Sequence, residues 1–263
     1  MLANTLEKQN KVGVSNLSMS KTGNDSLRLL EGNRDNSSSF SSIDTEELYQ
    51  QNLATQPKDW YWRSRPLTYT LNQQRYRAPE WKDCDWKNSI LFFGCSLAYG
   101  IGVDDSQTIS HYLSLRTGWP VINLGQSGTG IVFAWANSII LKEHNITPKA
   151  VVYLWSSTSR QTEFASETST IKHGIWDSST PWMQHLLAYE KHNSIITQYY
   201  VRNLRQFWNC PVIEASFYKD VSELTGCIHL DYKDYARDLK HPGPLTTAQA
   251  AFTIYDKIPR GMR

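Results

Sequence analysis

From residue 88 onward, short apolar runs alternate with longer segments in which apolar residues recur at helical spacing. The runs read SILFFG, PVINLG, KAVVYLW and CPVIEASFY, and a shorter run, IHL, follows them. An apolar run of this length is typical of a strand that is buried on both faces of a parallel sheet. The pattern therefore predicts strands at residues 89–94, 120–125, 149–155, 210–218 and 228–230.

The segments between these runs predict helices at residues 107–117, 130–144 and 246–258. A further amphipathic segment follows Pro181. Its apolar residues at helical spacing are Trp182, Leu186, Tyr189, Ile196, Tyr200, Leu204 and Phe207. Strands that alternate with helices indicate an α/β fold, a three-layer α/β/α sandwich around a parallel sheet of about five strands. In such folds, sites form in the loops at the carboxyl ends of the strands.

Residues 1–56 differ in composition from this regular part. The stretch GNDSLRLLEGNRDNSSSFSSIDTEE is rich in Ser, Asn, Asp and Gly and holds few large apolar residues. Such a segment buries too little surface to offset the entropy lost on ordering. We therefore expect a polar N-terminal extension that is flexible or ordered by a partner, with few contacts to residues 88–263.

Residues 57–87 form a third part, in which aromatic residues are interleaved with arginines. These residues are Trp60, Tyr61, Trp62, Tyr69, Tyr76, Trp81 and Trp86, with Arg63, Arg65, Arg75 and Arg77. One interpretation is a platform for sugars or single-stranded nucleic acid. The other is an extended arm that its aromatic residues anchor on the following domain, and the low net charge of the chain favours this one.

The composition narrows the class of protein. The chain has 263 residues, of which 40% are hydrophobic and 20% charged, with a net charge of +2. This balance indicates a soluble globular protein and excludes nucleic acid or an anionic membrane as the expected main partner. No apolar run approaches the ~20 residues that span a bilayer, and the N-terminus lacks a secretory h-region. We expect a cytoplasmic location.

The four cysteines include no C-x-x-C pair, and their spacing favours neither a disulfide framework nor a structural zinc site. Cys227 and His229 are the one Cys/His pair close enough in sequence to share a metal. Isolated side chains of these types are usually packing residues. We therefore expect no metal and no cofactor.

The first segment with candidate chemistry is FFGCSLAYG, in which Ser96 directly follows a predicted buried strand. A serine in this position stands at the carboxyl end of the strand, facing the crevice. Its backbone N–H, at the start of a helix, is available to a developing oxyanion. Cys95 is the alternative nucleophile, but the alternation of side chains turns it away from the side that Ser96 faces.

Two further segments supply small and titratable residues after strands. In VINLGQSGTG, glycines such as Gly128 allow a substrate to approach the backbone amides; their order does not fit a dinucleotide fingerprint. Near the chain end, ARDLKHPGP places Asp238 three residues before His241. A histidine so placed can take a proton from a serine while the carboxylate fixes its tautomer.

Together these three segments resemble, in order and spacing, the motif blocks of the SGNH (GDSL-like) hydrolases. Gly94, Ser96 and Gly100 match the Gly-Asp-Ser-x-x-x-Gly block, with Cys95 where Asp is usual. The resemblance covers roughly residues 89–258. It implies a flavodoxin-like sandwich and ester hydrolysis without a cofactor, through an acyl-serine intermediate. Ser96, Asp238 and His241 would be the catalytic set, with the Gly128 amide in the oxyanion hole.

One block departs from this family pattern. After the third strand the family shows Gly-x-Asn-Asp, whose Asn side chain donates to the oxyanion, whereas this chain reads LWSSTSR. Thr158 aligns best with that Asn and Ser157 lies beside it, so a hydroxyl is the expected substitute donor. Arg160 is expected to compensate electrostatically or to bind an acidic group, and Trp155 to contact substrate.

The expected substrate is a short ester, an O-acetyl group on a saccharide being favoured by the aromatic residues of the arm and Trp155. The alternative is a structural or binding protein that keeps the fold with little or no turnover. The missing Asn and the long polar N-terminus suit that alternative. A phage-encoded member would be a virion component, with residues 1–87 as the assembly contact.

Overall fold

The computed structural model describes residues 27–32, 39–177 and 179–262, and a five-stranded parallel sheet forms its centre. The strands of this sheet are β1 (Ile90–Gly94), β2 (Val121–Asn123), β3 (Ala150–Trp155), β6 (Val212–Ser216) and β7 (Ile228–His229). Their order across the sheet is β2-β1-β3-β6-β7, and every neighbouring pair is parallel. The predicted fold class and all five predicted strands are confirmed.

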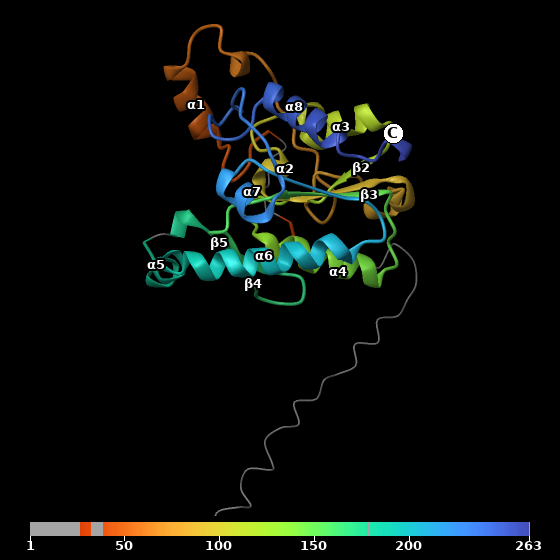
Figure 1. Cartoon of the computed structure of the whole chain (residues 1–263). Coiled ribbons are helices and arrows are strands. Elements are labelled where there is room, and N and C mark those ends of the chain that lie inside the picture. Colours follow the sequence, from red (N-terminus) through yellow and green to blue (C-terminus); the bar gives the residue numbers. More distant parts are fainter. Residues whose placement is uncertain (1–26, 33–38, 178, 263) are drawn as a thin grey trace, which may run out of the picture.

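Helices cover both faces of the sheet. Figure 1 shows α4 (Ile131–Glu143) and α6 (Glu190–Phe207) on one face, with α3 (Ile109–Thr117) and α8 (Pro244–Tyr255) on the other. Successive strand residues point to opposite faces, so β1, β2, β3 and β6 each contribute to two apolar clusters. Because both faces are buried, the strands need apolar residues at every position, and this produces the continuous apolar runs in the sequence.

The strand order determines where a site can form. β1 lies between β2 and β3, so the chain crosses first to one side of β1 and then to the other. Gly94 pairs with Leu154, which brings the carboxyl ends of β1 and β3 to the same edge of the sheet. In open α/β sheets, ligands bind in the crevice outside the carboxyl ends of two such strands, so a site is expected here.

Several elements were not predicted. An antiparallel hairpin of β4 (Gln161–Phe164) and β5 (Thr170–His173) follows β3, and a 3-10 helix at Ile175–Asp177 follows the hairpin. The predicted amphipathic segment is divided into α5 (Pro181–Ala188) and α6, and α7 (Lys219–Thr225) follows β6. The hairpin strands are four residues long and largely polar, so they carry little periodic signal.

The length and polarity of the helices also bear on membrane insertion. Among the helices of the described ranges, none combines the length and the apolar content that crossing a bilayer would require. α6, with 18 residues, carries Lys191 near its start and Arg202 and Arg205 near its end.

The expectation that the N-terminal extension makes few contacts with residues 88–263 is wrong for its described part. Leu27, Leu29 and Leu30 are buried in the apolar cluster that α4 and α6 share with the sheet. The Leu30 amide donates to Asn137 Oδ1 of α4 at 2.9 Å. The short apolar run LRLL was missed because the prediction was based on the overall polar composition of the extension. Residues 1–26 and 33–38 lie outside the described residues, and the three-part division of the chain stays a prediction.

A helix, α1 (Glu46–Thr55), forms in the same extension. The Thr45 hydroxyl caps it by accepting a hydrogen bond from the Leu48 amide at 3.2 Å, and two glutamates occupy its first turn. Both features satisfy or stabilise the free amides at a helix start. The Asn52 side chain of α1 reaches the carbonyl of Arg237 at 3.0 Å, so this helix also packs on the C-terminal domain.

The arm at residues 57–87 is anchored by its aromatic residues, as the second interpretation predicted. Trp62, Tyr69, Tyr76, Trp81 and Trp86 are each at most 5% exposed. The Tyr76 hydroxyl donates to the Leu30 carbonyl at 2.6 Å and accepts from Asn137 at 3.0 Å. The arm therefore lies between the N-terminal segment and the domain, and the cost of burying the phenol is offset by two hydrogen bonds.

We expect Leu30→Ala to lower the free energy of unfolding by about 2–5 kcal/mol, the cost of a buried Leu-to-Ala change. Leu30 is 1% exposed and packs in the main core. Leu115→Ala is the control, because Leu115 is 68% exposed and its loss should change stability by less than about 0.5 kcal/mol. Chemical denaturation measures both; equal effects would show that residues 27–32 do not belong to the folded core.

Candidate active site

Ser96 lies where β1 turns into a short helix, α2 (Ser96–Tyr99). Gly100, with φ of +83°, ends this helix in the left-handed conformation that glycine adopts readily. Ser96 is therefore the first residue of the helix, at the carboxyl edge of the sheet and beside the crevice between β1 and β3. This turn places the Ser96 hydroxyl and backbone N–H at the carboxyl edge of the sheet, as the sequence predicted.

Ser96, His241 and Asp238 form one continuous chain of hydrogen bonds. His241 Nε2 lies 2.9 Å from Ser96 Oγ, and His241 Nδ1 lies 2.5 Å from Asp238 Oδ2. The three residues are 0%, 9% and 1% exposed, respectively. Residues 145 positions apart in the sequence are thus brought together in the predicted order. This is the geometry that a serine nucleophile, a general base and an orienting carboxylate require.

The loop that carries Asp238 and His241 is tight. Asp238 Oδ1 accepts hydrogen bonds from the amides of Lys240 (3.1 Å) and His241 (3.0 Å). Leu239 between them has φ of +59°, a left-handed conformation that costs a non-glycine residue about 1–2 kcal/mol. The Ala236 amide closes the loop on the His241 carbonyl at 2.8 Å.

The pKa of Asp238 reflects the same contacts. Burial by itself raises the pKa of this carboxyl, but the hydrogen bond with the His241 ring, the His241 charge and two backbone amides outweigh it. The pKa therefore lies below its ordinary value. The carboxylate is held ionised beside the imidazole, which fixes the ring tautomer that presents Nε2 to the serine.

The glycine-rich loop after β2 lies against the start of α2. The Gln126 amide donates to the Gly94 carbonyl at 3.0 Å, and a Cβ on Gly125 would stand 2.6 Å from the Tyr99 nitrogen. Gly128 follows with φ of +79°, which disfavours any side chain there. The loop thus brings the Gly128 amide to the same edge of the sheet as Ser96, as the second motif block predicted.

Ser127, beside Gly128, is a residue that the sequence analysis did not single out. It is buried, and its hydroxyl has no hydrogen-bond partner in the part of the chain that the structure describes. A buried hydroxyl without a partner costs roughly 1–3 kcal/mol. Such a group next to a candidate oxyanion amide is itself a candidate for contact with a bound molecule.

The turn after β3 holds the residues that replace the family's third block. The Arg160 amide donates to the Ser157 carbonyl at 3.1 Å, and the Ser157 and Ser159 hydroxyls lie 2.9 Å apart. Thr158, half-buried, lies between them. This turn begins at the carboxyl end of β3, across the crevice from Ser96, but the role of the Thr158 hydroxyl stays a prediction.

Arg160, at the end of this turn, lies near side chains of three other segments. Its guanidinium lies 5.2 Å from the centre of the Trp176 ring. Burial by itself lowers the pKa of Arg160, but the nearby Cys95 thiol and Tyr218, with which it hydrogen-bonds, raise it above its ordinary value. Arg160 is therefore close to the residue that precedes Ser96, and its side chain spans the ends of β3 and β6.

That Trp155 contacts substrate stays a prediction, and most of its side chain lies in the core. Trp155 is 3% exposed, and its ring stacks on that of Tyr153 with centroids 4.5 Å apart. Its indole N–H donates to Glu214 at 3.0 Å. Trp155 is the last residue of β3 and points to the same face as Tyr153, two residues earlier, so the alternation of the strand places it in the core.

Cys95 packs in the apolar cluster beneath α3 and α8 and is 1% exposed. The histidine nitrogen that a nucleophile needs is directed at Ser96 instead. Among the residues that the structure describes, no group of three or more His, Cys, Asp or Glu side chains has a metal-binding arrangement.

The hairpin after β3 contributes residues that sequence reasoning missed. A Cβ built on Gly128 would have Lys172 Cδ at 3.5 Å and Trp176 Cη2 at 3.7 Å, so these two side chains lie over that loop. Tyr232 lies near Tyr218, Cys95 and Asp238, and its pKa is raised by burial and by these neighbours. These aromatic and basic groups thus lie near Gly128 or near the residues that flank Ser96 and His241, and no local periodicity marks them in the sequence.

No protein-family model matches the chain, and no curated protein matches it in sequence. Fifteen chains of solved structures are similar to it, among them the following three. One is a carbohydrate esterase family 2 enzyme of Corynascus thermopiles (Myceliophthora fergusii) with a carbohydrate binding domain, at 12% identity and a TM-score of 0.41. The match covers 65% of this chain and 65% of that enzyme, just under two thirds of its length.

The second is a carbohydrate esterase whose active site is described as having divergent catalytic and non-catalytic binding functions. It is 13% identical, with 66% of this chain and 70% of that chain covered and a TM-score of 0.44. The third is a GDSL-like lipase from Bacteroides uniformis, at 11% identity, with coverages of 65% and 95% and a TM-score of 0.41. At these identities and scores, the function of this chain is inferred from its own residues.

We expect the stability of the wild type to fall more steeply in acid than that of Asp238→Asn. Because the folded chain lowers the pKa of Asp238, the carboxylate stabilises the fold above its unfolded pKa of about 3.9. That contribution is lost as the pH falls through the lowered folded value. Thermal unfolding at pH 7 and at about pH 2.5 measures the difference. Asp220→Asn, at an exposed position, should follow the wild type; an equally steep fall in Asp238→Asn would contradict the linkage.

Proposed function

We propose that the protein is a serine esterase of the SGNH type that hydrolyses short acyl esters. The observation that supports this most directly is the hydrogen-bonded chain from Asp238 through His241 to Ser96, with links of 2.5 and 2.9 Å. The chain ends at the carboxyl edge of a parallel sheet, at the crevice where the strand order reverses.

In the proposed reaction, Ser96 Oγ attacks the ester carbonyl while His241 Nε2 takes the hydroxyl proton. The tetrahedral intermediate collapses to an acyl-serine, and His241 gives its proton to the departing alcohol. Water then attacks the acyl-serine, again with His241 as the base, and releases the acid and the free serine. Asp238 stays ionised throughout, fixes the imidazole tautomer and stabilises the imidazolium.

The developing oxyanion needs preorganised donors. The Ser96 amide, at the start of α2, and the Gly128 amide, in the glycine-rich loop, are two of them in this proposal. Two hydroxyls compete for the third position: Thr158, which aligns with the family's Asn, and Ser127, which is buried and has no hydrogen-bond partner among the described residues. Loss of one oxyanion donor typically costs ~2.7–4 kcal/mol of transition-state stabilisation.

The substrate that we propose is an O-acetyl ester, on a saccharide rather than a long acyl chain. This finer assignment is supported by the groups around the crevice: Trp176, Tyr218 and Tyr232 offer ring faces and hydroxyls, and Arg160 and Lys172 offer cationic donors. A sugar, with its polar rim and apolar ring face, suits such a wall. An aliphatic chain would instead need a tunnel of apolar side chains.

A second candidate function is binding without turnover, as in a structural component that retains the fold. Two observations favour it: Ser96 is fully buried, and no Asn stands in the third block. Under this hypothesis the crevice holds a ligand, or residues 1–87 serve assembly, and esters are not cleaved at a useful rate.

We expect purified wild type to hydrolyse p-nitrophenyl acetate and an acetylated sugar, and Ser96→Ala to lower kcat by at least about 1000-fold. The hydroxyl is the only group removed, so the variant should unfold at the temperature of the wild type. Mass spectrometry of the wild type with a fluorophosphonate should locate the adduct on Ser96. Activity that persists in Ser96→Ala would contradict the esterase proposal, and an inactive, unlabelled wild type would favour the binding function.

We expect Thr158→Val to lower kcat by roughly 10- to 1000-fold, because it keeps the shape of the side chain and removes the donor. Thr158→Asn, which restores the family's donor, should be tolerated and should raise kcat. Ser127→Ala is the matched comparison and tests the competing hydroxyl. Steady-state kinetics on p-nitrophenyl acetate separate the two; an unchanged kcat in Thr158→Val beside a large loss in Ser127→Ala would assign the donor to Ser127.

A further inference from the structure

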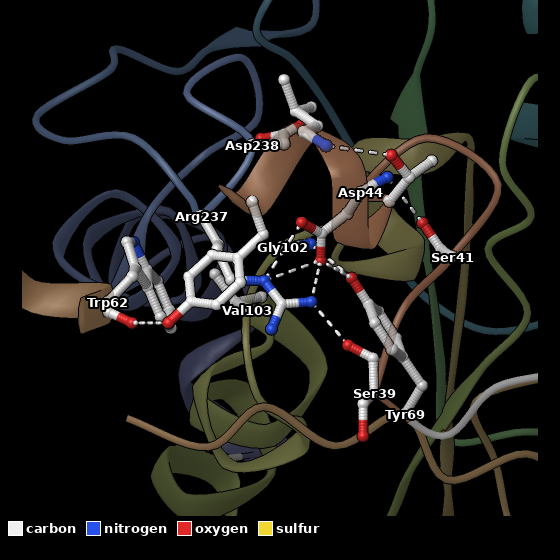
Figure 2. Close-up of polar contacts among 12 residues, drawn as sticks. Ser39, Ser41, Asp44, Trp62, Tyr69, Gly102, Val103, Arg237 and Asp238 are labelled. Atoms are coloured by element: carbon white, nitrogen blue, oxygen red, sulfur yellow. Dashed lines mark hydrogen bonds and ion pairs between the residues drawn. The ribbon is translucent and has the colours of Figure 1, made fainter. Parts of the chain in front are cut away.

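Arg237, the residue before Asp238, forms a buried ion pair with Asp44 of the N-terminal segment. Arg237 Nη2 lies 2.7 Å from Asp44 Oδ2, and Arg237 Nε lies 3.1 Å from Asp44 Oδ1. Arg237 is 4% exposed and Asp44 is fully buried. Figure 2 shows the Arg237 guanidinium facing the Asp44 carboxylate. Arg237 and Asp44 are 193 positions apart in sequence.

Other groups of the N-terminal part complete the surroundings of this pair. The Ser39 carbonyl accepts from Arg237 Nη2 at 2.5 Å, and the rings of Phe40 and Tyr49 lie 4.6 and 5.0 Å from the guanidinium. The Asp44 carboxylate accepts from the Tyr69 hydroxyl at 2.8 Å. Both charges are therefore hydrogen-bonded, which a buried ion pair requires.

The backbone of Arg237 is held from outside its own loop as well. Its amide donates to the Gly102 carbonyl at 3.0 Å, and its carbonyl accepts from Asn52 Nδ2 of α1 at 3.0 Å. The Gly102 amide in turn donates to the Tyr69 hydroxyl at 2.8 Å (Figure 2). Side chain, amide and carbonyl of the residue next to Asp238 are thus each fixed by a different segment.

The loop that follows has a reason to need such support. Leu239 adopts a left-handed conformation between Asp238 and His241, and Asp238 must keep one oxygen on two amides and the other on the imidazole. Strained backbone of this kind persists only where the surrounding structure over-determines it. Within the loop itself, the Ala236–His241 and Leu239–Ala236 backbone hydrogen bonds provide closure but no attachment to the rest of the fold.

We propose that Asp44 is a positioning residue for the active site: through Arg237 it holds Asp238 on Nδ1 of His241, so that the segment 39–55 forms part of the catalytic unit. The proposal rests on the esterase function proposed above. Asp44 does not touch the reacting atoms and acts only through Arg237. A buried ion pair is poor evidence of a purely stabilising role, because apolar residues of the same volume often stabilise a fold as well or better.

A double-mutant cycle in the full chain tests the positioning role. Asp44→Asn should lower kcat by about 10- to 100-fold, the cost of a small displacement of a catalytic group, while KM changes less than about 3-fold. In an Asp238→Asn background the same change should lower kcat less than about 2-fold, because there is no carboxylate left to position. Equal factors in both backgrounds would show that Asp44 only stabilises the fold and would overturn the proposal.

Two further variants control for folding. Asp44→Asn leaves the Arg237 charge unpaired, so Tyr69→Phe serves where that protein does not fold. It removes the hydrogen bonds of the Tyr69 hydroxyl with Asp44 and with the Gly102 amide, and should lower kcat by about 3- to 10-fold. Asp44→Glu keeps the charge and should recover part of the lost kcat. Arg205→Gln breaks the Arg205–Glu214 pair, which joins α6 to β6, and should lower the unfolding temperature with kcat unchanged.

A readout without substrate separates this proposal from the proposed function. In the wild type, the proton between His241 Nδ1 and Asp238 should give a far-downfield ¹H NMR signal, which Asp238→Asn removes and so assigns. Folded Asp44→Asn, or Tyr69→Phe in its place, should weaken or shift that signal, and Arg205→Gln should retain it. A wild type without esterase activity would end the esterase proposal alone. If the signal is unchanged in folded Asp44→Asn or in Tyr69→Phe, the positioning role is overturned, whatever the activity.

Discussion

The carboxyl end of β1 approaches β3 so closely that only a glycine fits there. A Cβ on Gly94 would stand 2.7 Å from the Leu154 carbonyl oxygen and 2.6 Å from the Ala98 Cβ. This contact fixes the level at which β1 ends, and hence the start of α2 and the place of Ser96. The Gly94 carbonyl in turn accepts from the Gln126 amide, which positions the glycine-rich loop. Ser96, the Gly128 amide and the turn after β3 therefore share one edge because of one close backbone approach.

Buried polar groups at this edge of the sheet also need hydrogen-bond partners. Asp238 and His241 hydrogen-bond with each other, His241 with Ser96, and Asp238 with two backbone amides. An ionised carboxylate is thereby kept in a site almost closed to water. Arg160, close to the residue that precedes Ser96, is supported by a tyrosine and a tryptophan ring. The hydroxyl of Ser127 is a buried exception among the described residues, and it lies beside the amide where an oxyanion would form.

Most features that depend on neighbouring residues in the sequence could be predicted, whereas contacts that no motif marks between residues far apart in the sequence could not. The strands were predictable because burial on both faces favours nearly continuous apolar runs. Ser96 was predictable because it directly follows such a run, and His241 because it stands three residues after Asp238 and just before Pro-Gly and a predicted helix. The LRLL run of the extension was hidden in a polar average. The β4–β5 hairpin is too short to show a period. Trp155 could have been placed in the core from the alternation of its own strand, but Asp44 could not, because its partner is 193 residues away.

That separation has a consequence for how the chain folds. Segments 27–32 and 39–55 are synthesised long before Arg237, which pairs with Asp44 through its side chain and with Asn52 through its carbonyl. Closing so long a loop costs entropy before any contact repays it, and such non-local contacts slow folding. Until residue 237 has been made, Asp44 lacks its arginine and Asn52 lacks the carbonyl that it contacts. The hydrogen bond between Ser96 and His241 likewise forms only after a segment 145 residues further along the chain has been made.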